Sequence, residues 1–316
     1  MSGVVIIGAG HAAAQLCASL REQKVEGPIT VVGNEGQLPY HRPPLSKTFV
    51  KDDQTPVPAI RPASYYEKLG VTLVLDDAAT AIDREARRLT LASGRTLDYD
   101  WLVIATGARA RRLPTIPPGT GRVHELRNAA DALGLRQAFA GIDSLTVIGG
   151  GFIGLEIAAT ARQLGKRARV IEAAGRLLGR AVSPELSDYL LRTHREAGID
   201  IALEARIDEV VVEDGELVAL VVDGQREPVE ALVVGIGAEP VVELAKAAGL
   251  DCANGVVVDA SMRTADPTIL AIGDCVSFPR STGEGMLRLE SVQNANDQAR
   301  CAALTIAGRP APYAAP

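Results

Sequence analysis

Two glycine-rich turns of the same kind lie 141 positions apart, counted from Gly8 to Gly149. The first reads GAGHAA at residues 8–13, and the second reads GGGFIG at residues 149–154. Each follows a short apolar run and opens a segment with helical periodicity, and a further apolar run comes after each helix. This internal repeat predicts an α/β chain with two Rossmann-like, three-layer dinucleotide-binding domains, the second inserted in the first.

The small residues of the first turn each have a distinct role in binding a dinucleotide. Gly8 permits the tight turn, Gly10 lets the backbone approach a pyrophosphate at the helix N-terminus, and Ala13 permits close packing of the helix on the strand. The corresponding positions of the second turn are Gly149, Gly151 and Gly154. One such turn is a weak signal, but two complete copies predict that the chain holds two dinucleotides.

An acidic residue follows each unit at the end of its second apolar run. Glu35 lies 22 residues after Ala13, and Glu172 lies 18 residues after Gly154. A carboxylate at this position accepts hydrogen bonds from the ribose hydroxyls of an adenosine, and its charge disfavours a 2′-phosphate. We therefore expect NADH to be preferred over NADPH in the second unit, by a margin that the nearby Arg176 would reduce.

An enzyme with two dinucleotide sites most simply pairs a tightly held flavin with an exchangeable nicotinamide, because the flavin can receive the hydride. Two segments near the C-terminus favour the first unit as the flavin site. The apolar run 269–272 delivers Asp274 at a strand end, and the last helix is expected over residues 294–306, just after Val292 and Gln293. Unpaired N–H groups at that helix N-terminus would suit the flavin edge that becomes anionic on reduction.

Composition excludes several other classes of function. The formal charge is −6, with acids and bases mixed along the chain, so we expect neither nucleic acid nor a membrane surface as partner. No apolar run reaches the roughly 18 residues of a membrane helix, and the first residues do not resemble a signal peptide, so we expect a cytoplasmic protein. The four cysteines are widely separated and the four histidines do not cluster, so no metal site is expected.

The order of these motifs resembles the FAD-dependent NADH:ferredoxin reductases of oxygenase systems. The resemblance is carried by GAGHAA, PYHRPPLSK, ATGARAR, GGGFIGLE, GIGAEP, AIGDC and RLESVQNA, and it covers nearly the whole chain. It implies FAD bound by the first unit and NADH bound by the second. The residues that it implies as FAD contacts are Ala12, Glu35, Arg42, Lys47, Ala79, Ala105, Arg127, Asp274 and Val292.

The same resemblance implies the domain boundaries and the chemistry. Residues 1–107 and 237–316 would bind FAD, and residues 108–236 would bind NADH. The third, smaller domain that usually follows in this family is expected to be absent from a chain that stops at residue 316. Lys47 would lie beside the flavin N5, and Glu156 would contact the nicotinamide and pair with Lys47. The electrons would pass singly to a small [2Fe–2S] ferredoxin, and the enzyme would be a monomer or a weak homodimer.

Three alternatives remain from the residues. A rubredoxin reductase or an NADH oxidase would have the same fold, and a redox sensor would bind both cofactors without rapid turnover. Thiol–disulfide chemistry is not expected, because it requires a reactive cysteine beside the flavin. The loop after the second strand, residues 33–50, contains no cysteine, and Cys17 lies within the first helix.

Overall fold

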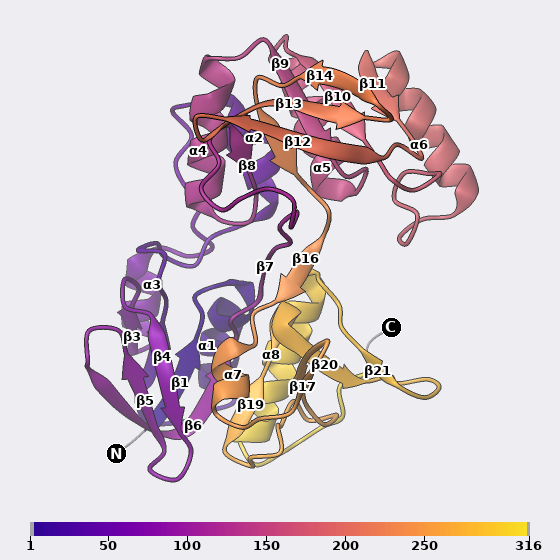
Figure 1. Cartoon of the computed structure of the whole chain (residues 1–316). Coiled ribbons are helices and arrows are strands. Elements are labelled where there is room, and N and C mark those ends of the chain that lie inside the picture. Colours follow the sequence, from indigo (N-terminus) through magenta and orange to yellow (C-terminus); the bar gives the residue numbers. More distant parts are fainter. Residues whose placement is uncertain (1–2, 315–316) are drawn as a thin grey trace. The chain divides into compact units, whose positions relative to one another are not determined.

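The computed structural model describes residues 3–314. The chain forms two compact units, shown in Figure 1. The first unit comprises Met1–His41, Ala59–Arg109 and Glu239–Pro316, and the second comprises Arg42–Pro58 and Ala110–Ala238. The expected boundary residues 1–2 and 315–316 lie outside the described residues.

A mostly parallel sheet forms the centre of the first unit, in the strand order β3-β2-β1-β6 with β19 on the other side of β6. Its strands are β1 (Gly3–Ile7), β2 (Ile29–Val32), β3 (Val71–Val74), β6 (Thr96–Ile104) and β19 (Ile269–Ala271). From β1 the chain adds β2 and β3 on one side and then returns to add β6 on the other, so the strand order reverses between β1 and β6. Ligands of such sheets bind at this point. The first half of β6 also pairs antiparallel with β5 (Arg88–Leu91), which pairs with β4 (Ala79–Asp83).

The apolar sequence of β1 explains why this sheet is central. Val4, Val5, Ile6 and Ile7 are all buried although successive side chains point to opposite faces, so both faces of the sheet must be covered. Helices α1 (His11–Glu22) and α8 (Val292–Ile306), which contact each other and lie side by side in Figure 1, contribute their buried faces to this core. The β4–β5 hairpin and α7 (Glu243–Ala247) contribute to the same core.

Short elements complete the first unit. They are α3 (Ala63–Lys68), β17 (Cys252–Ala253), β18 (Gly255–Val257), η2 (Gly273–Cys275), β20 (Val276–Pro279) and β21 (Met286–Leu287). Strands β7 (Ala108–Ala110) and β16 (Ala238–Pro240) each contain residues of both units. Strands β17, β18, β20 and β21 form a small sheet of their own, and β16 pairs with β7.

The second unit is built on a five-stranded parallel sheet in the order β11-β10-β9-β15-β8. Its strands are β8 (Val123–His124), β9 (Ser144–Ile148), β10 (Arg167–Ile171), β11 (Ile199–Ala202) and β15 (Leu232–Val234). The arrangement repeats that of the first unit, and the strand order here reverses between β9 and β15. The repeat that the two glycine turns predicted is therefore confirmed at the level of sheet topology.

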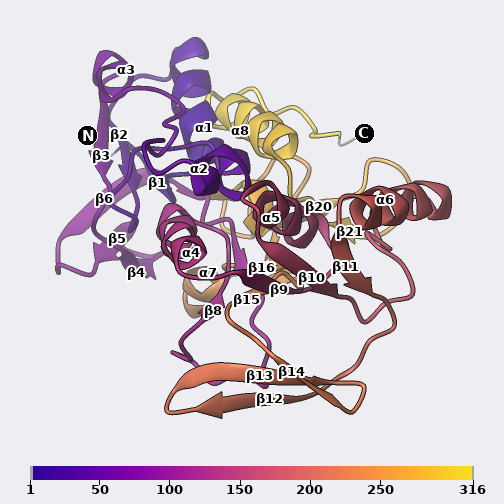
Figure 2. The ribbon, with the colours of Figure 1, turned by 90° about the horizontal axis from the view of Figure 1, so that it is seen from above.

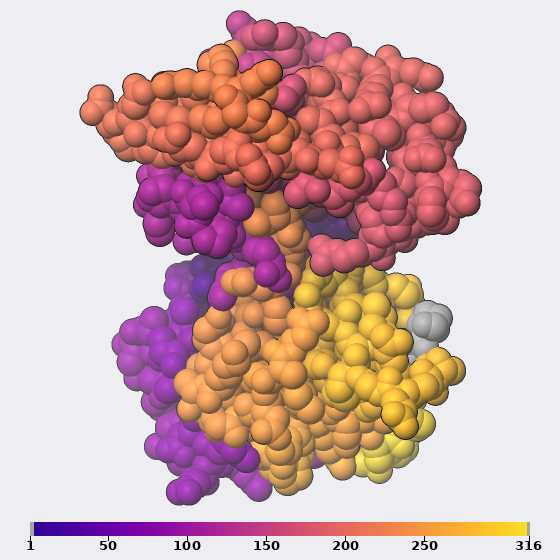
Figure 3. Space-filling model, turned by 45° about the vertical axis from the view of Figure 1, so that its right-hand side comes forward, coloured from indigo at the N-terminus to yellow at the C-terminus, as the bar shows by residue number. Residues whose placement is uncertain are grey.

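Different layers cover the two faces of this sheet. Figure 2 shows helices α5 (Phe152–Gln163) and α6 (Pro184–Glu196) on one side and a three-stranded antiparallel sheet on the other. That sheet consists of β12 (Ile207–Glu213), β13 (Glu216–Val222) and β14 (Gln225–Pro228), and it lies at the surface of the unit in Figure 3. The expected hairpin around Asp214 and Gly215 is confirmed, and both residues have the positive φ that its turn requires.

One segment packs differently from its expected place. The boundaries implied by the resemblance place residues 42–58 in the first unit, but in the structure Arg42–Pro58 belongs to the second. This segment contains η1 (Pro43–Ser46) and α2 (Thr48–Lys51), which contact α4 (Ala129–Ala140) and α5. The Arg136 guanidinium of α4 donates hydrogen bonds to the backbone carbonyls of Phe49, Asp53 and Thr55, and it covers the Phe49 ring. One partly buried arginine therefore attaches the segment by several hydrogen bonds to residues that are distant in sequence.

Candidate dinucleotide-binding sites

The first glycine turn joins the carboxyl ends of two neighbouring strands. Gly8 has a φ of +110°, and a Cβ added to it would lie 2.1 Å from the carbonyl oxygen of Ala105 at the end of β6. The Gly8 N–H donates to Val32 O at 2.7 Å, and the Ala105 N–H donates to Ile7 O at 2.7 Å. Only glycine fits at this position. The turn therefore lets the backbones of β1, β2 and β6 approach one another closely at the point where the strand order of the sheet reverses.

The beginning of α1 is open to an anionic ligand. A Cβ added to Gly10 would meet no atom within 4 Å, and no side chain in the described part of the chain caps this helix end. By contrast, the N-terminus of α4 is closed by a reciprocal capping box between Asn128 and Asp131. Uncapped N–H groups carry the partial positive charge of the helix dipole, and the empty space at Gly10 fits a diphosphate. Ala12 and Ala13 are buried directly behind this opening.

Two further predicted residues of the first unit lie at the same end of the sheet. Gly273 has a φ of +83°, and its added Cβ would approach the Cβ of Ala12 at 3.4 Å, so the turn that presents Asp274 contacts the start of α1. Glu35 is exposed after β2 and accepts a hydrogen bond from the Tyr40 hydroxyl. The sequence reasoning had not named Tyr40, which orients this carboxylate.

The last helix begins at Val292, two residues before its expected start at residue 294. The expectation of an open helix end is only partly met, because the Ser291 hydroxyl accepts the N–H of Asn294 at 3.1 Å. Val292 itself is exposed, Ala105 is buried, and Ala79 is the first residue of β4. These three positions remain predicted FAD contacts that the fold leaves in the first unit.

The second glycine turn reproduces the first with different residues. Gly149 has a φ of +106°, and its added Cβ would lie 2.4 Å from Gly235 O at the end of β15. Its N–H donates to Ile171 O at 2.8 Å, which matches the bond from Gly8 to Val32. A Cβ added to Gly151 would make only an ordinary contact, 3.9 Å from Gly235 O, and α5 also begins without a side-chain cap among the described residues. A Cβ on Gly154 would lie 2.1 Å from Gly149 O, so this third position must be glycine for α5 to pack on β9.

Glu172 is fixed by the backbone of its own loop. Its Oε2 accepts the N–H of Gly150 at 2.5 Å, and its Oε1 accepts the N–H of Ala174 at 2.7 Å. The carboxylate therefore lies against the glycine turn, where it keeps further lone pairs for ribose hydroxyls. Arg176 donates to the carbonyls of Val182, at 2.9 Å, and Gly179. These bonds fix the position of the guanidinium, and its effect on the choice of coenzyme stays a prediction.

Lys47 and Glu156 form an ion pair within the second unit, with Lys47 Nζ 2.7 Å from Glu156 Oε2. The pair is partly exposed, at 48% for the lysine side chain and 31% for the glutamate, so its attraction is modest. Two residues that the sequence did not reveal support it. Ser46 is buried and donates its hydroxyl to Glu156 Oε2, and Thr160, one turn along α5, donates to Ser46 O at 2.8 Å.

Arg42 and Arg127 are brought together in the second unit. An Arg42 Nη1 donates to the backbone carbonyl of Arg127 at 2.8 Å, and the Arg127 N–H donates to Asp131 Oδ2 at 2.9 Å. The contact joins the loop before η1 to the loop before α4, although the two residues are 85 positions apart. Two of the predicted flavin contacts are therefore neighbours in space.

The cysteines show no sign of redox reactivity. Burial raises the pKa of Cys17 to about 12 and that of Cys301 to about 11, and it also raises the pKa of Cys252 and Cys275. All four thiols are free. A thiol with a raised pKa is a poor nucleophile near neutral pH, because little of it is present as thiolate. Residues 3–314 contain no group of His, Cys, Asp and Glu side chains that could hold a metal ion.

Comparisons with known proteins show the class of protein that has this fold. Residues 2–299 match the family described as pyridine nucleotide-disulphide oxidoreductase. Rhodocoxin reductase of Rhodococcus erythropolis is 42% identical over 312 residues, which are 98% of this chain and 73% of that protein. The ferredoxin–NAD(+) reductase component of the p-cumate 2,3-dioxygenase system of Pseudomonas putida is 41% identical over 316 residues, 100% of this chain and 77% of that protein.

A solved structure agrees with these relatives. The crystal structure of the ferredoxin reductase for the CYP199A2 system from Rhodopseudomonas palustris has a TM-score of 0.95 and 42% identity, over 99% of this chain and 78% of that chain. The chain belongs to the pyridine nucleotide-disulphide oxidoreductase family. Within it the chain is a flavoprotein reductase of the ferredoxin reductase type, and its cofactors are FAD and a nicotinamide dinucleotide. The resemblance, the fold class and the cofactors predicted from the sequence are confirmed.

Proposed function

We propose that the enzyme transfers a hydride from NADH to FAD and passes single electrons on to a [2Fe–2S] ferredoxin that serves an oxygenase. One observation carries the proposal: each unit has a glycine turn and an uncapped helix start where its strand order reverses, and an acidic residue follows the next strand of the sheet. The relatives support the acceptor, since they are named as ferredoxin reductases of such systems. We further propose that the protein works in the cytoplasm. No helix within residues 3–314 is long and apolar enough to cross a membrane.

We assign FAD to the first unit and NADH to the second. Gly10, Ala12 and the start of α1 would bind the flavin diphosphate, Glu35 would bind the adenosine ribose, and Asp274 would bind on the flavin side. In the second unit Gly151 and the start of α5 would bind the diphosphate of NADH, and Glu172 its ribose. The remaining proposed FAD contacts are Ala79, Ala105, Val292, Arg42 and Arg127.

The chain's own residues contribute positioning rather than acid–base catalysis. The chemistry that FAD supplies when bound is the acceptance of a hydride and the release of electrons one at a time. We propose that the Lys47 ammonium favours the electron-rich form of the flavin ring and that Glu156 orients the nicotinamide. Ser46 restricts the carboxylate of Glu156 to one direction through its buried hydroxyl. Holding reacting groups in place in this way lowers the barrier without a proton transfer by the protein.

The test is a two-step experiment on the purified protein. Acid release and chromatography identify the flavin, and anaerobic stopped-flow mixing with NADH follows the loss of its visible absorbance. Reoxidation by a [2Fe–2S] ferredoxin and by a rubredoxin is then compared. We expect one FAD per chain, rapid reduction by NADH and faster reoxidation by the ferredoxin. FMN, slow reduction with a long-lived charge-transfer complex, or a preference for rubredoxin would contradict the proposal.

A further inference from the structure

A glutamine in the last helix has one unsatisfied end inside the first unit. Gln298 of α8 is fully buried, with 0% of its surface exposed. Its Oε1 accepts the N–H of Gly273 at 2.7 Å. Its Nε2, buried in the same place, has no hydrogen-bond partner among the described residues. The amide therefore uses its acceptor and leaves two N–H donors unpaired.

An unpaired donor at this depth is costly. Leaving a buried donor without a partner disfavours the folded state by roughly tenfold to a hundredfold in the folding equilibrium. The other buried polar side chains of α8 avoid this cost. Asn294 donates to Leu289 O and accepts from the Tyr313 hydroxyl, and Thr305 donates to Ser261 O. The exception at Gln298 indicates a partner that is absent from the protein itself.

The position of Gln298 indicates what that partner is. Gly273, to which it is bonded, approaches Ala12, and Ala12 lies in the first turn of the uncapped helix α1. Helices α1 and α8 pack against each other, and Gln298 is bonded to the turn that approaches the first residues of α1. The ligand chemistry that fits this helix start is a diphosphate.

We propose that Gln298 is a binding residue for the diphosphate of the FAD. Its Nε2 donates to a diphosphate oxygen, directly or through one enclosed water, while its Oε1 holds the Gly273 turn in its left-handed conformation. The proposal rests on the proposed binding of FAD in the first unit. It adds a residue from the last helix to the cradle formed by Gly10 and the start of α1.

Three variants of the full chain test it. Gln298→Leu removes both the donor and the acceptor, and Gln298→Glu keeps an acceptor for Gly273 but replaces the donor with an oxygen. Thr305→Val is the matched control, because it removes a paired buried polar group from the same helix. Release of FAD from the holoprotein on dilution is followed by flavin fluorescence. Phosphorus NMR of the holoprotein reports the diphosphate directly, and thermal unfolding checks the fold.

We expect both Gln298 variants to raise the dissociation constant of FAD by about tenfold to a hundredfold and to shift the diphosphate resonances. Thr305→Val should lower the unfolding temperature and leave both cofactor readouts unchanged. The proposal is overturned if FAD binds within twofold of the wild type in both Gln298 variants, if the phosphorus spectrum is unchanged, or if Thr305→Val loosens FAD equally. A wild-type chain without FAD would instead contradict the proposed function.

Discussion

The Ser46 hydroxyl donates its hydrogen bond to the same Glu156 oxygen that accepts the Lys47 ammonium at 2.7 Å. Thr160, one helical turn further along α5, binds the Ser46 carbonyl, so Ser46 is attached to α5 at two successive turns. Two donors on one oxygen leave the carboxylate a single orientation. A residue with no redox chemistry of its own thus controls the geometry of the proposed pair.

We predict that Ser46→Ala slows flavin reduction by NADH mainly by raising KM, by about tenfold to a hundredfold, because a hydrogen bond to a charged carboxylate is worth about 1.5–3 kcal/mol. Lys47→Met should slow the reductive half-reaction itself and lower the flavin potential. Stopped-flow reduction at varied NADH measures both effects. The control is Lys51→Met, which removes a lysine bonded to Gln163 from the neighbouring short helix. Equal behaviour of the Lys47 and Lys51 variants would leave Lys47 as an ordinary surface residue.

Glu172 should set the choice of nicotinamide coenzyme. Glu172→Gln removes the charge while its amide oxygen can still accept one of the two loop N–H groups. We expect kcat/KM for NADH to fall by about 10- to 100-fold and that for NADPH to fall less, since a hydrogen bond to a charged group is worth about 1.5–3 kcal/mol. Steady-state kinetics with both coenzymes check this. If wild type already uses both equally, the assignment of Glu172 to the ribose is wrong.

Alanine substitutions of glycines in the two turns should impair the protein for different reasons. Gly10→Ala places a methyl group in open space, so the fold should be intact while FAD affinity falls by at least about tenfold. Gly154→Ala places its Cβ 2.1 Å from Gly149 O, so it should destabilise the second unit by about 1–3 kcal/mol or more. Gly134→Ala in the interior of α4 is the control and should stabilise by about 0.5–1 kcal/mol. Flavin titration and thermal unfolding separate the three cases.

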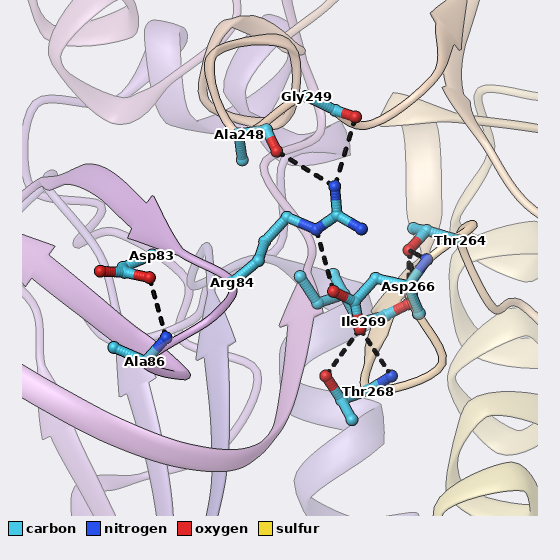
Figure 4. Close-up of polar contacts among 9 residues, drawn as sticks. All are labelled: Asp83, Arg84, Ala86, Ala248, Gly249, Thr264, Asp266, Thr268 and Ile269. Carbon is cyan, nitrogen blue, oxygen red and sulfur yellow. Dashed lines mark hydrogen bonds and ion pairs between the residues drawn. The ribbon is translucent and has the colours of Figure 1, made fainter.

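The carboxylate of Asp266 should make the first unit sensitive to acid. Burial acts to raise its pKa, but the Arg84 guanidinium at 2.9 Å and hydrogen bonds from the Thr268 N–H and hydroxyl outweigh burial and lower it (Figure 4). Arg84 also donates to the carbonyls of Ala248 and Gly249 at the end of α7, as Figure 4 shows.

A lowered pKa stabilises the folded state above the pKa of the unfolded chain, near 3.8, and the stabilisation is lost as pH falls through the folded value. Asp266→Asn should therefore cost about 1–3 kcal/mol near pH 7, and its difference from wild type should shrink below about pH 4. Urea unfolding can be followed by the fluorescence of Trp101, the single tryptophan. It reports on the first unit because Trp101 lies in β6. A difference that stays constant between pH 7 and pH 3 would contradict the role of the charge.

Much of the fold could be predicted from the sequence because the relevant signals are local. The apolar runs at 4–7 and 145–148 became β1 and β9, and the turn at Asp214 and Gly215 became the hairpin. The capping box of α4 at Asn128 and Asp131 is an equally local signal that the sequence reasoning did not use. Long-range packing is harder to predict from the sequence. Residues 42–58 are expected in the first unit, but Arg136 attaches them to the second.

The two glycine turns, the strands and helices around them and the acids that follow could all be predicted from the residues alone. Each depends on the backbone freedom of a glycine or on the spacing of apolar residues within about 30 positions. Which distant groups lie close together depends on the packing of the whole chain. Ser46 lies 110 positions from Glu156, and Gln298 is bonded to Gly273. A hydroxyl or an amide in the sequence carries no information about its partner, because the partner is set by how the helices and sheets pack.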